Sequence, residues 1–258
     1  MSEQRDHYLV FPIWLLRHGC HPDTVTPEQA NRRLWAIAWY CLQDAAGSLY
    51  GHLPAQDQLF AAARTVGLLT YANWSPDSVR NARDEIHKLR LSTPDQQTGK
   101  KLCRMRLDYF LTYAQGSRSH KRTAWREFAV LTSVLAVCFD KRSAVKATNE
   151  QLAAMAIGYG SQSQARAADQ SAALLASHQI RHTRNALAKR KLFQHCAKQR
   201  GQYFSVGKTS EQLAVYVAAV GIQAKKKRAE AAKRVQTKTA DQQLADLKAR
   251  FPDKKTSH

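Results

Sequence analysis

Apolar residues recur at helical spacing through most of this chain and are interrupted by short segments of other character. The spacing predicts three helices in the first part. One begins at Pro27 with Thr26 as its capping residue, a second starts near Asp57, and a third begins at Pro76. The extended segment Tyr8–Pro12 precedes them and is predicted as a strand. The chain therefore opens with a strand and three helices.

Strict alternation of polar and apolar residues follows the third helix. Leu102, Arg104 and Arg106 alternate with Cys103 and Met105, and the pattern continues to residue 109. Because side chains of a strand point to opposite faces in turn, this alternation predicts a strand over 102–109 with one solvent-exposed face.

A similar series of elements follows a polar linker at 115–122. A long helix is predicted from Trp125 to Phe139, and a short capped helix opens after Thr148. A polar, alanine-rich insert at 161–177 has helical composition and no match in the first half. A further helix over 179–192 and a strand over 203–206 complete the series.

Two of the predicted helices share one pattern and lie 101 residues apart. In both, an aliphatic residue is followed by two arginines three positions apart, then by an aliphatic residue, a lysine and a closing leucine. A glycine among polar and basic residues follows each copy, Gly99 and Gly201 respectively. Chance similarity of two amphipathic helices is the alternative. A repeat turns one weak pattern into two that support each other, and the copies are SVRNARDEIHKLRL at 78–91 and QIRHTRNALAKRKL at 179–192.

The balance of charge points to a polyanionic partner. The 258 residues include 40 Lys and Arg against 20 Asp and Glu, which gives a formal net charge of +20 and a pI near 10.0. Nucleic acid is the first candidate and an anionic membrane surface the second. No acidic residue occurs from residue 170 to 210, where lysines and arginines are frequent. This one-sided distribution favours binding to a nucleic acid backbone.

Several classes of function are disfavoured. No apolar run approaches the roughly 18 residues of a membrane span, and the five cysteines are odd in number and widely spaced, so we expect a cytoplasmic protein without membrane contact. His18, Cys20 and His21 lack further ligands at metal-binding spacing. There is no Walker-type loop and no nucleophile elbow. We expect no enzyme, no metal and no cofactor.

Three helices and a strand beyond a basic turn, occurring twice, is the element order of a winged helix-turn-helix domain. The sequence predicts a mainly α (α+β) fold with two tandem winged-helix domains, at 1–114 and 123–208. The linker at 115–122 joins them, and a basic helical tail at 209–258 follows. The usual interpretation of such a basic tail is a solvated, frayed helix, and contact with a nucleic acid backbone is the alternative.

In a helix-turn-helix fold the third helix enters the major groove, and in the winged form the wing lies along the backbone. On the second copy, the residues near the amino end are expected to contact base edges, and the later ones and the wing to contact phosphate. The base-edge set is Gln179, Arg181, His182 and Asn185, and the phosphate set is Arg184, Lys189, Arg190, Lys198 and Arg200.

The first copy offers an equivalent but less favourable set. Asp84 and Glu85 interrupt it, and carboxylates repel phosphate, so this helix is alternatively expected to face the other domain or a second subunit. We therefore expect the second copy to be the main DNA-binding helix. The candidate DNA-binding residues of the first copy and its wing are Ser78, Arg80, Asn81, Arg83, Lys100, Lys101 and Arg104.

In its order of elements and its internal repeat, Val79–Leu91 against Ile180–Leu192, the chain resembles the tandem winged-helix replication initiators of bacterial plasmids and related phages. The resemblance implies binding to repeated double-stranded DNA sites at an origin, local opening of the duplex and recruitment of host replication proteins. It also implies self-repression as a homodimer. A transcriptional regulator or partition protein of a mobile element is one alternative, and a charge-driven RNA-binding or nucleoprotein factor is another.

Overall fold

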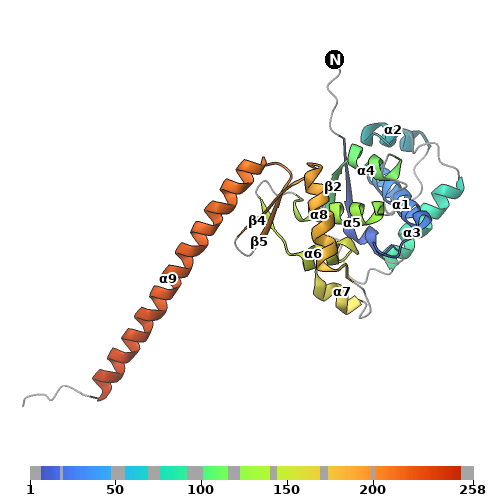
Figure 1. The fold of residues 1–258 in the computed structure, drawn as a ribbon. Helices are drawn as coiled ribbons and strands as arrows, with labels where there is room; N and C mark the ends of the chain where they lie inside the picture. Colours follow the sequence, from blue (N-terminus) through green and yellow to red (C-terminus); the bar gives the residue numbers. More distant parts are fainter. Residues whose placement is uncertain are drawn as a thin grey trace, which may run out of the picture.

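The computed structural model describes residues 7–17, 20–47, 56–68, 76–91, 101–115, 123–139, 144–168, 174–198 and 201–250. The described chain is mainly helical and holds two small antiparallel sheets (Figure 1). In chain order the elements are β1 (Tyr8–Pro12), the 3-10 turn η1 (Ile13–Leu16), α1 (Pro27–Ala45), α2 (Gln56–Val66), α3 (Pro76–Leu91), β2 (Leu102–Arg106), α4 (Leu107–Ala114), α5 (Ala124–Val137), β3 (Val145–Lys146), α6 (Asn149–Ala156), α7 (Gln162–Ala168), α8 (Ser177–Lys189), β4 (Gln194–Lys198), β5 (Gly201–Ser205) and α9 (Ser210–Arg250).

The helix starts that the sequence predicts are confirmed. At α1 the Thr26 hydroxyl accepts a hydrogen bond from the Gln29 backbone N–H, and the Gln29 side chain accepts one from the Thr26 N–H. At α6 the Thr148 hydroxyl accepts from the Gln151 N–H. Each bond satisfies a donor that the first helical turn leaves without a partner, so these caps fix where the helices begin.

The strand predicted over 102–109 is shorter than its alternation suggests. β2 ends at Arg106, and α4 begins at the next residue. Cys103 and Met105 are fully buried, as the alternation predicts, but Phe110 and Tyr113 then turn inward at helical spacing. The partner of β2 is the amino-terminal strand β1, with Val10 opposite Arg104. Residues 102–114 therefore do not form the strand pair of a wing.

The second half has a different sheet. β5 lies between β3 and β4, and both pairings are antiparallel. At its centre Phe204 stands opposite Val145 on one side and opposite His195 on the other. The strand predicted over 203–206 is thus β5, shifted to begin at Gly201, and β4 was not predicted as a strand.

Helix α5 is the centre of the molecule, and elements of both halves pack around it (Figure 1). All of its residues except Arg126 and Glu127 are buried. Phe128 packs against Phe11 and Phe110 of the first half, while α6 and α8 cover other faces of the helix. Most of the buried apolar side chains, from Leu9 to Phe204, form one continuous cluster. The two predicted domains therefore share a core, and their division stays a prediction. The linker predicted at 115–122 lies outside the described residues, apart from Gln115.

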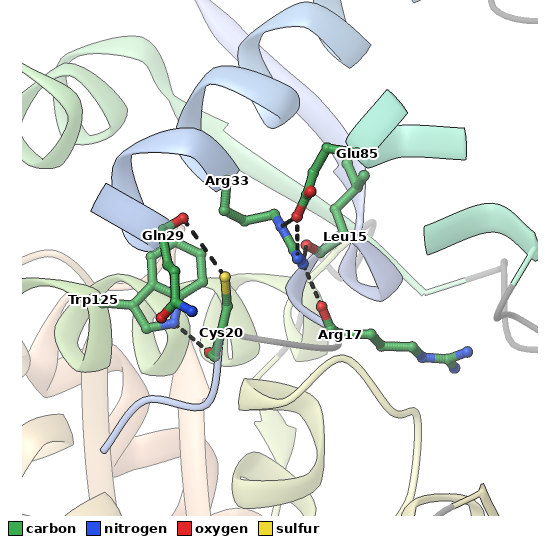
Figure 2. Close-up of polar contacts among 7 residues, drawn as sticks. All are labelled: Leu15, Arg17, Cys20, Gln29, Arg33, Glu85 and Trp125. Atoms are coloured by element: carbon green, nitrogen blue, oxygen red, sulfur yellow. Dashed lines mark hydrogen bonds and ion pairs between the residues drawn. The ribbon is translucent and has the colours of Figure 1, made fainter. Parts of the chain in front are cut away.

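A buried arginine joins the elements of the first half (Figure 2). Arg33 of α1 is 2% exposed. Its guanidinium donates to the backbone carbonyls of Leu15 and Arg17, and two of its nitrogens reach the Glu85 carboxylate of α3, at 2.6 and 3.1 Å. α1, η1 and α3 thus converge on one charged group whose hydrogen bonds are made inside the protein.

The same region continues into the second half. Arg17 leaves η1 and donates from Nε to the Gly158 carbonyl at 2.9 Å, and its guanidinium lies over the Tyr159 ring. Gly158 has φ +88, and a Cβ there would lie 2.9 Å from the Arg17 backbone nitrogen, so only glycine fits. A second contact between the two halves is made by the Trp125 indole of α5, which donates to the Cys20 carbonyl at 2.7 Å (Figure 2).

The carboxyl-terminal helix α9 extends 41 residues and leaves the body of the protein (Figure 1). Only its beginning packs: Leu213 and Val217 are 1% exposed and lie with Ala144 against β4 and β5. From residue 222 onward every side chain for which burial is described is exposed. The basic tail is therefore an ordered helix attached to the core by its first two turns.

The attachment of α9 predicts a position-specific loss of stability. We expect Leu213→Ala to lower the free energy of unfolding by about 2–4 kcal/mol, because it removes a buried leucine from a packed site. Val215→Ala, two residues along the same helix and 70% exposed, should change it by less than about 0.5 kcal/mol. Urea unfolding followed by circular dichroism measures both, and equal effects would show that the start of α9 is not packed.

The Arg33 network predicts a second, larger effect. Arg33→Met should lower the free energy of unfolding by about 3–5 kcal/mol, because it leaves the Glu85 carboxylate and two backbone carbonyls without their donor. Arg32→Met is the matched control, since Arg32 is exposed on the same helix and should change stability by less than about 0.5 kcal/mol. Chemical denaturation at neutral pH gives both values, and a neutral Arg33→Met would contradict this account.

Candidate nucleic-acid interface

Helix α8 has a solvent-exposed stripe and a buried stripe. Ile180, Thr183 and Leu187 face the core, as the sequence predicts, and pack toward α5 and α6. The residues of the opposite stripe are exposed and recur at intervals of three or four positions, so they share one face of the helix. This face contains no acidic residue and consists of His178, Arg181, His182, Asn185 and Lys189.

Gln179, at the start of α8, contacts the first half of the chain. Its side-chain oxygen accepts from the Ala176 N–H at 2.9 Å, and its nitrogen donates to the Asp23 carboxylate at 3.1 Å. The other oxygen of that carboxylate is paired with Arg126 of α5. Gln179 is therefore a positioning residue that holds the amino end of α8 against the loop before α1, and it lies beside the exposed face.

Arg184 does not lie where the sequence analysis expects it. It is 3% exposed, and its guanidinium donates to Asn149 of α6 at 2.9 Å and to Asn185 at 3.0 Å. Burial, together with the charge of Arg181, lowers its pKa. The side chain ties α8 to the start of α6 and is not placed to reach a phosphate, so it does not belong to the candidate interface.

Arg190, just after α8, is also engaged inside the protein. Its guanidinium lies 2.7 Å from the Glu127 carboxylate of α5 and 3.3 Å from the Tyr113 hydroxyl of α4. The two remaining predicted cations of this helix, Arg181 and Lys189, are exposed. Four of the seven polar residues expected on α8 lie together on its exposed face: Arg181, His182, Asn185 and Lys189. The other three, Gln179, Arg184 and Arg190, contact other parts of the protein.

A two-stranded hairpin follows this helix along the chain. β4 and β5 pair from Gln194 opposite Ser205 to Lys198 opposite Gly201. Arg200 at its turn and the side chain of Lys198 lie outside the described residues. Within the hairpin, the ring of His195 on β4 stacks on that of Phe204, the residue opposite it on β5, with ring centroids 5.2 Å apart. Burial and the nearby Arg184 charge lower the pKa of His195 to about 4, so the folded protein holds this histidine neutral.

The first copy of the repeat is turned differently. Glu85 is directed inward to Arg33 (Figure 2). One of the two carboxylates that interrupt this helix is therefore paired with an arginine of α1. Arg80, Asn81 and Arg83 are exposed, but so is Asp84. Of the predicted wing residues, Lys101 and Arg104 are exposed, and Arg104 lies over the Tyr8 ring at 4.2 Å. The Ser78 side chain and Lys100 lie outside the described residues.

Sequence reasoning missed the buried arginines Arg17 and Arg33. Arg33 lies between apolar residues of α1, one position before Leu34 and four before Ile37, so its place on the buried side of that helix was visible in the pattern. Its partner, Glu85, is 52 residues away along the chain. The spacing alone gives no sign of that pairing.

Comparison with family models, with curated proteins and with solved structures finds no match for this chain. Among the described residues, no helix has the length and apolar character needed to cross a membrane. No group of three or more histidine, cysteine or acidic side chains in the described part is arranged to hold a metal ion.

The neutral His195 predicts a specific dependence of stability on pH. Its pKa is about 4 in the folded protein and about 6.5 in the unfolded chain. The unfolded state therefore binds the proton more readily, and stability present above pH 6.5 is lost as the pH falls toward 4. Phenylalanine does not titrate. Between pH 6.5 and pH 4 we therefore expect the free energy of unfolding of His195→Phe to fall by about 1–3 kcal/mol less than that of the wild type. Urea midpoints at several pH values measure the difference, and parallel curves would contradict the prediction.

Proposed function

We propose that this chain is a sequence-specific, double-stranded DNA-binding protein that initiates replication of a plasmid or phage. The observation that carries the DNA-binding part is the exposed face of α8, with two histidines, an arginine, an asparagine and a lysine and without a carboxylate. A solvated helix surface ordinarily mixes charges of both signs. A face with one sign of charge and with base-recognising side chains is suited to nucleic acid.

The order of elements supports a winged helix for the second half. α5, β3, α6, α8, β4 and β5 follow one another as three helices with a strand after the first and a hairpin after the third, and α7 is inserted before α8. β5 pairs with both β3 and β4 and joins the hairpin to the rest of the sheet. In this proposal α8 is the recognition helix and the β4–β5 hairpin is the wing.

The dimensions of the helix face fit a major groove. His178 and Lys189 are eleven residues apart, which at 1.5 Å per residue is about 17 Å along the axis. A groove about 12 Å wide admits one helix. Arg181 and Asn185, in the amino-terminal two thirds, are the side chains suited to guanine and adenine edges respectively. Lys189 at the carboxyl end is suited to a phosphate.

The first half takes a secondary part in the proposal. Its helices α1, α2 and α3 precede β2 in the predicted order, but β2 pairs with β1, and α4 takes the place of a second wing strand. Arg80, Asn81 and Arg83 are exposed, and so is Asp84. We assign α3 a weaker contact with the DNA backbone, and we assign recognition of bases to α8.

The role in replication is supported by the resemblance in element order and by the internal repeat. It is tested separately from DNA binding, with a plasmid that has no other origin and carries this gene with its flanking DNA. Replication in a host, and its loss when the reading frame is interrupted, is the expected result. Specific binding without replication would indicate a transcriptional regulator or partition protein.

The α8 assignment predicts two distinguishable classes of variant. Once a site has been selected from a random duplex pool, Arg181→Ala should weaken specific binding by about 1–3 kcal/mol and leave binding to random duplex nearly unchanged. Lys189→Ala should weaken both alike and lower the salt slope by about 1, because it removes a phosphate contact. Fluorescence anisotropy at several salt concentrations measures all of these.

Arg32→Met serves as the control in the same titrations, because it removes an exposed positive charge of α1 that lies outside the proposed interface. Its affinity should match that of the wild type. Equal losses on specific and random duplex for Arg181→Ala would remove α8 from the recognition of bases.

A further inference from the structure

A cleft of about 560 Å³ opens where the two halves meet, and none of its lining residues belongs to the exposed face of α8. Its walls come from β1 and β2, from the start of α4, from the end of α5, from the turn between α8 and β4, and from the loop before α9. A volume of 300–1,000 Å³ is typical of pockets that hold small organic ligands.

Positive side chains from separate segments converge on this cleft. Arg104 and Arg106 come from β2, Lys191 from the turn after α8, and Lys208 from the loop before α9. Among the described residues that line the cleft, every side chain that is charged at neutral pH is a cation. Asp108, beside them, is paired with Arg106 at 3.0 Å. The site is therefore suited to an anion.

Aromatic rings line the same space. Tyr8 and Tyr109 stand beside the two arginines, with Arg104 over Tyr8 at 4.2 Å and Arg106 over Tyr109 at 5.2 Å. Phe139 and Phe193 contribute from the other half. Tyr8 is 36% exposed, so an aromatic surface is open to the solvent at the rim. Aromatic rings and guanidinium planes are the surfaces on which nucleobases stack.

Lys191 is in a conformation that its side chain does not favour. It has φ 59, the only positive φ among non-glycine residues in the described chain. Its N–H bonds to the Ala188 carbonyl, and the next N–H bonds to the Leu187 carbonyl, which is the helix ending that usually has glycine at this position. A lysine here is unfavourable for the backbone and places a cation at the cleft.

We propose that this cleft binds one nucleotide unit, a phosphate joined to a planar base. The phosphate lies among Lys191, Lys208 and Arg104, and the base stacks on the tyrosine and arginine surfaces of the rim. A base within a duplex is covered on both faces by its neighbours, so the ligand is a free nucleotide or an unpaired nucleotide of a strand. The site does not depend on the assignment of α8, because it shares none of the residues of that face.

The test is calorimetric titration of the full chain with dAMP and, separately, with an unpaired oligonucleotide of thymidines. We expect at least one of them to bind. Tighter binding of dAMP identifies a free nucleotide as the ligand, and tighter binding of the oligonucleotide identifies an unpaired strand. No heat from either at about 1 mM would overturn the proposal. Competition by inorganic phosphate as effective as that by dAMP would also overturn it, because the base would then contribute nothing.

Two variants localise the site. Lys191→Gly should weaken binding about tenfold, and it should leave the protein at least as stable because glycine adopts this φ without strain. Lys208→Gln should weaken binding similarly. Unchanged affinity in both variants would contradict the proposal. Lys189→Ala, on the exposed face of α8, should bind dAMP as the wild type does, so failure of the cleft and failure of the duplex interface give different results.

Discussion

The burial of one guanidinium constrains much of this fold. Arg33 has five N–H donors inside a core where an unpaired charge is costly, so the backbone of η1 and the Glu85 carboxylate must remain where they satisfy it. Because Arg17 leaves the same η1 segment and bonds to Gly158, the requirement continues into the second half. The bonds of Asn149 and Gln179 then position α8 against α6 and the loop before α1. The candidate interface is therefore held in place by a series of polar contacts as well as by apolar packing.

The two copies of the repeated helix turn opposite charges inward, at positions two residues apart in the shared pattern. In the first copy the inward group is Glu85, which α1 neutralises with Arg33. In the second it is Arg184, held by the uncharged oxygens of Asn149 and Asn185. The corresponding arginine of the first copy, Arg83, is exposed. One sequence pattern thus has two packing solutions. The second copy contains no Asp or Glu, so its exposed face has no carboxylate.

Local features were predictable from the sequence, and long-range pairings were not. The caps at Thr26 and Thr148 and the buried residues of α8 follow from side-chain chemistry within a few positions of each other. The pairing of β2 with β1 does not, because alternation shows which side chains share a face and gives no information on the partner strand. Arg184 was assigned outward because a charged residue in a helical pattern is ordinarily exposed. Its burial depends on hydrogen bonds to Asn185 and to Asn149, which is 35 residues away along the chain. The residues that line the cleft come from segments between Tyr8 and Lys208, so no single stretch of sequence predicts it.

Helix α9 projects a long way from the body of the protein (Figure 1). Its packed part ends near Val217, and at 1.5 Å per residue the remaining 33 residues to Arg250 extend about 50 Å beyond the sheet. That distance equals the axial length of about 15 base pairs of duplex. The lysines and arginines of this helix, from Lys225 onward, are therefore held at fixed distances from the hairpin. A surface that binds them must be long, or must present negative charge well away from the body of the protein.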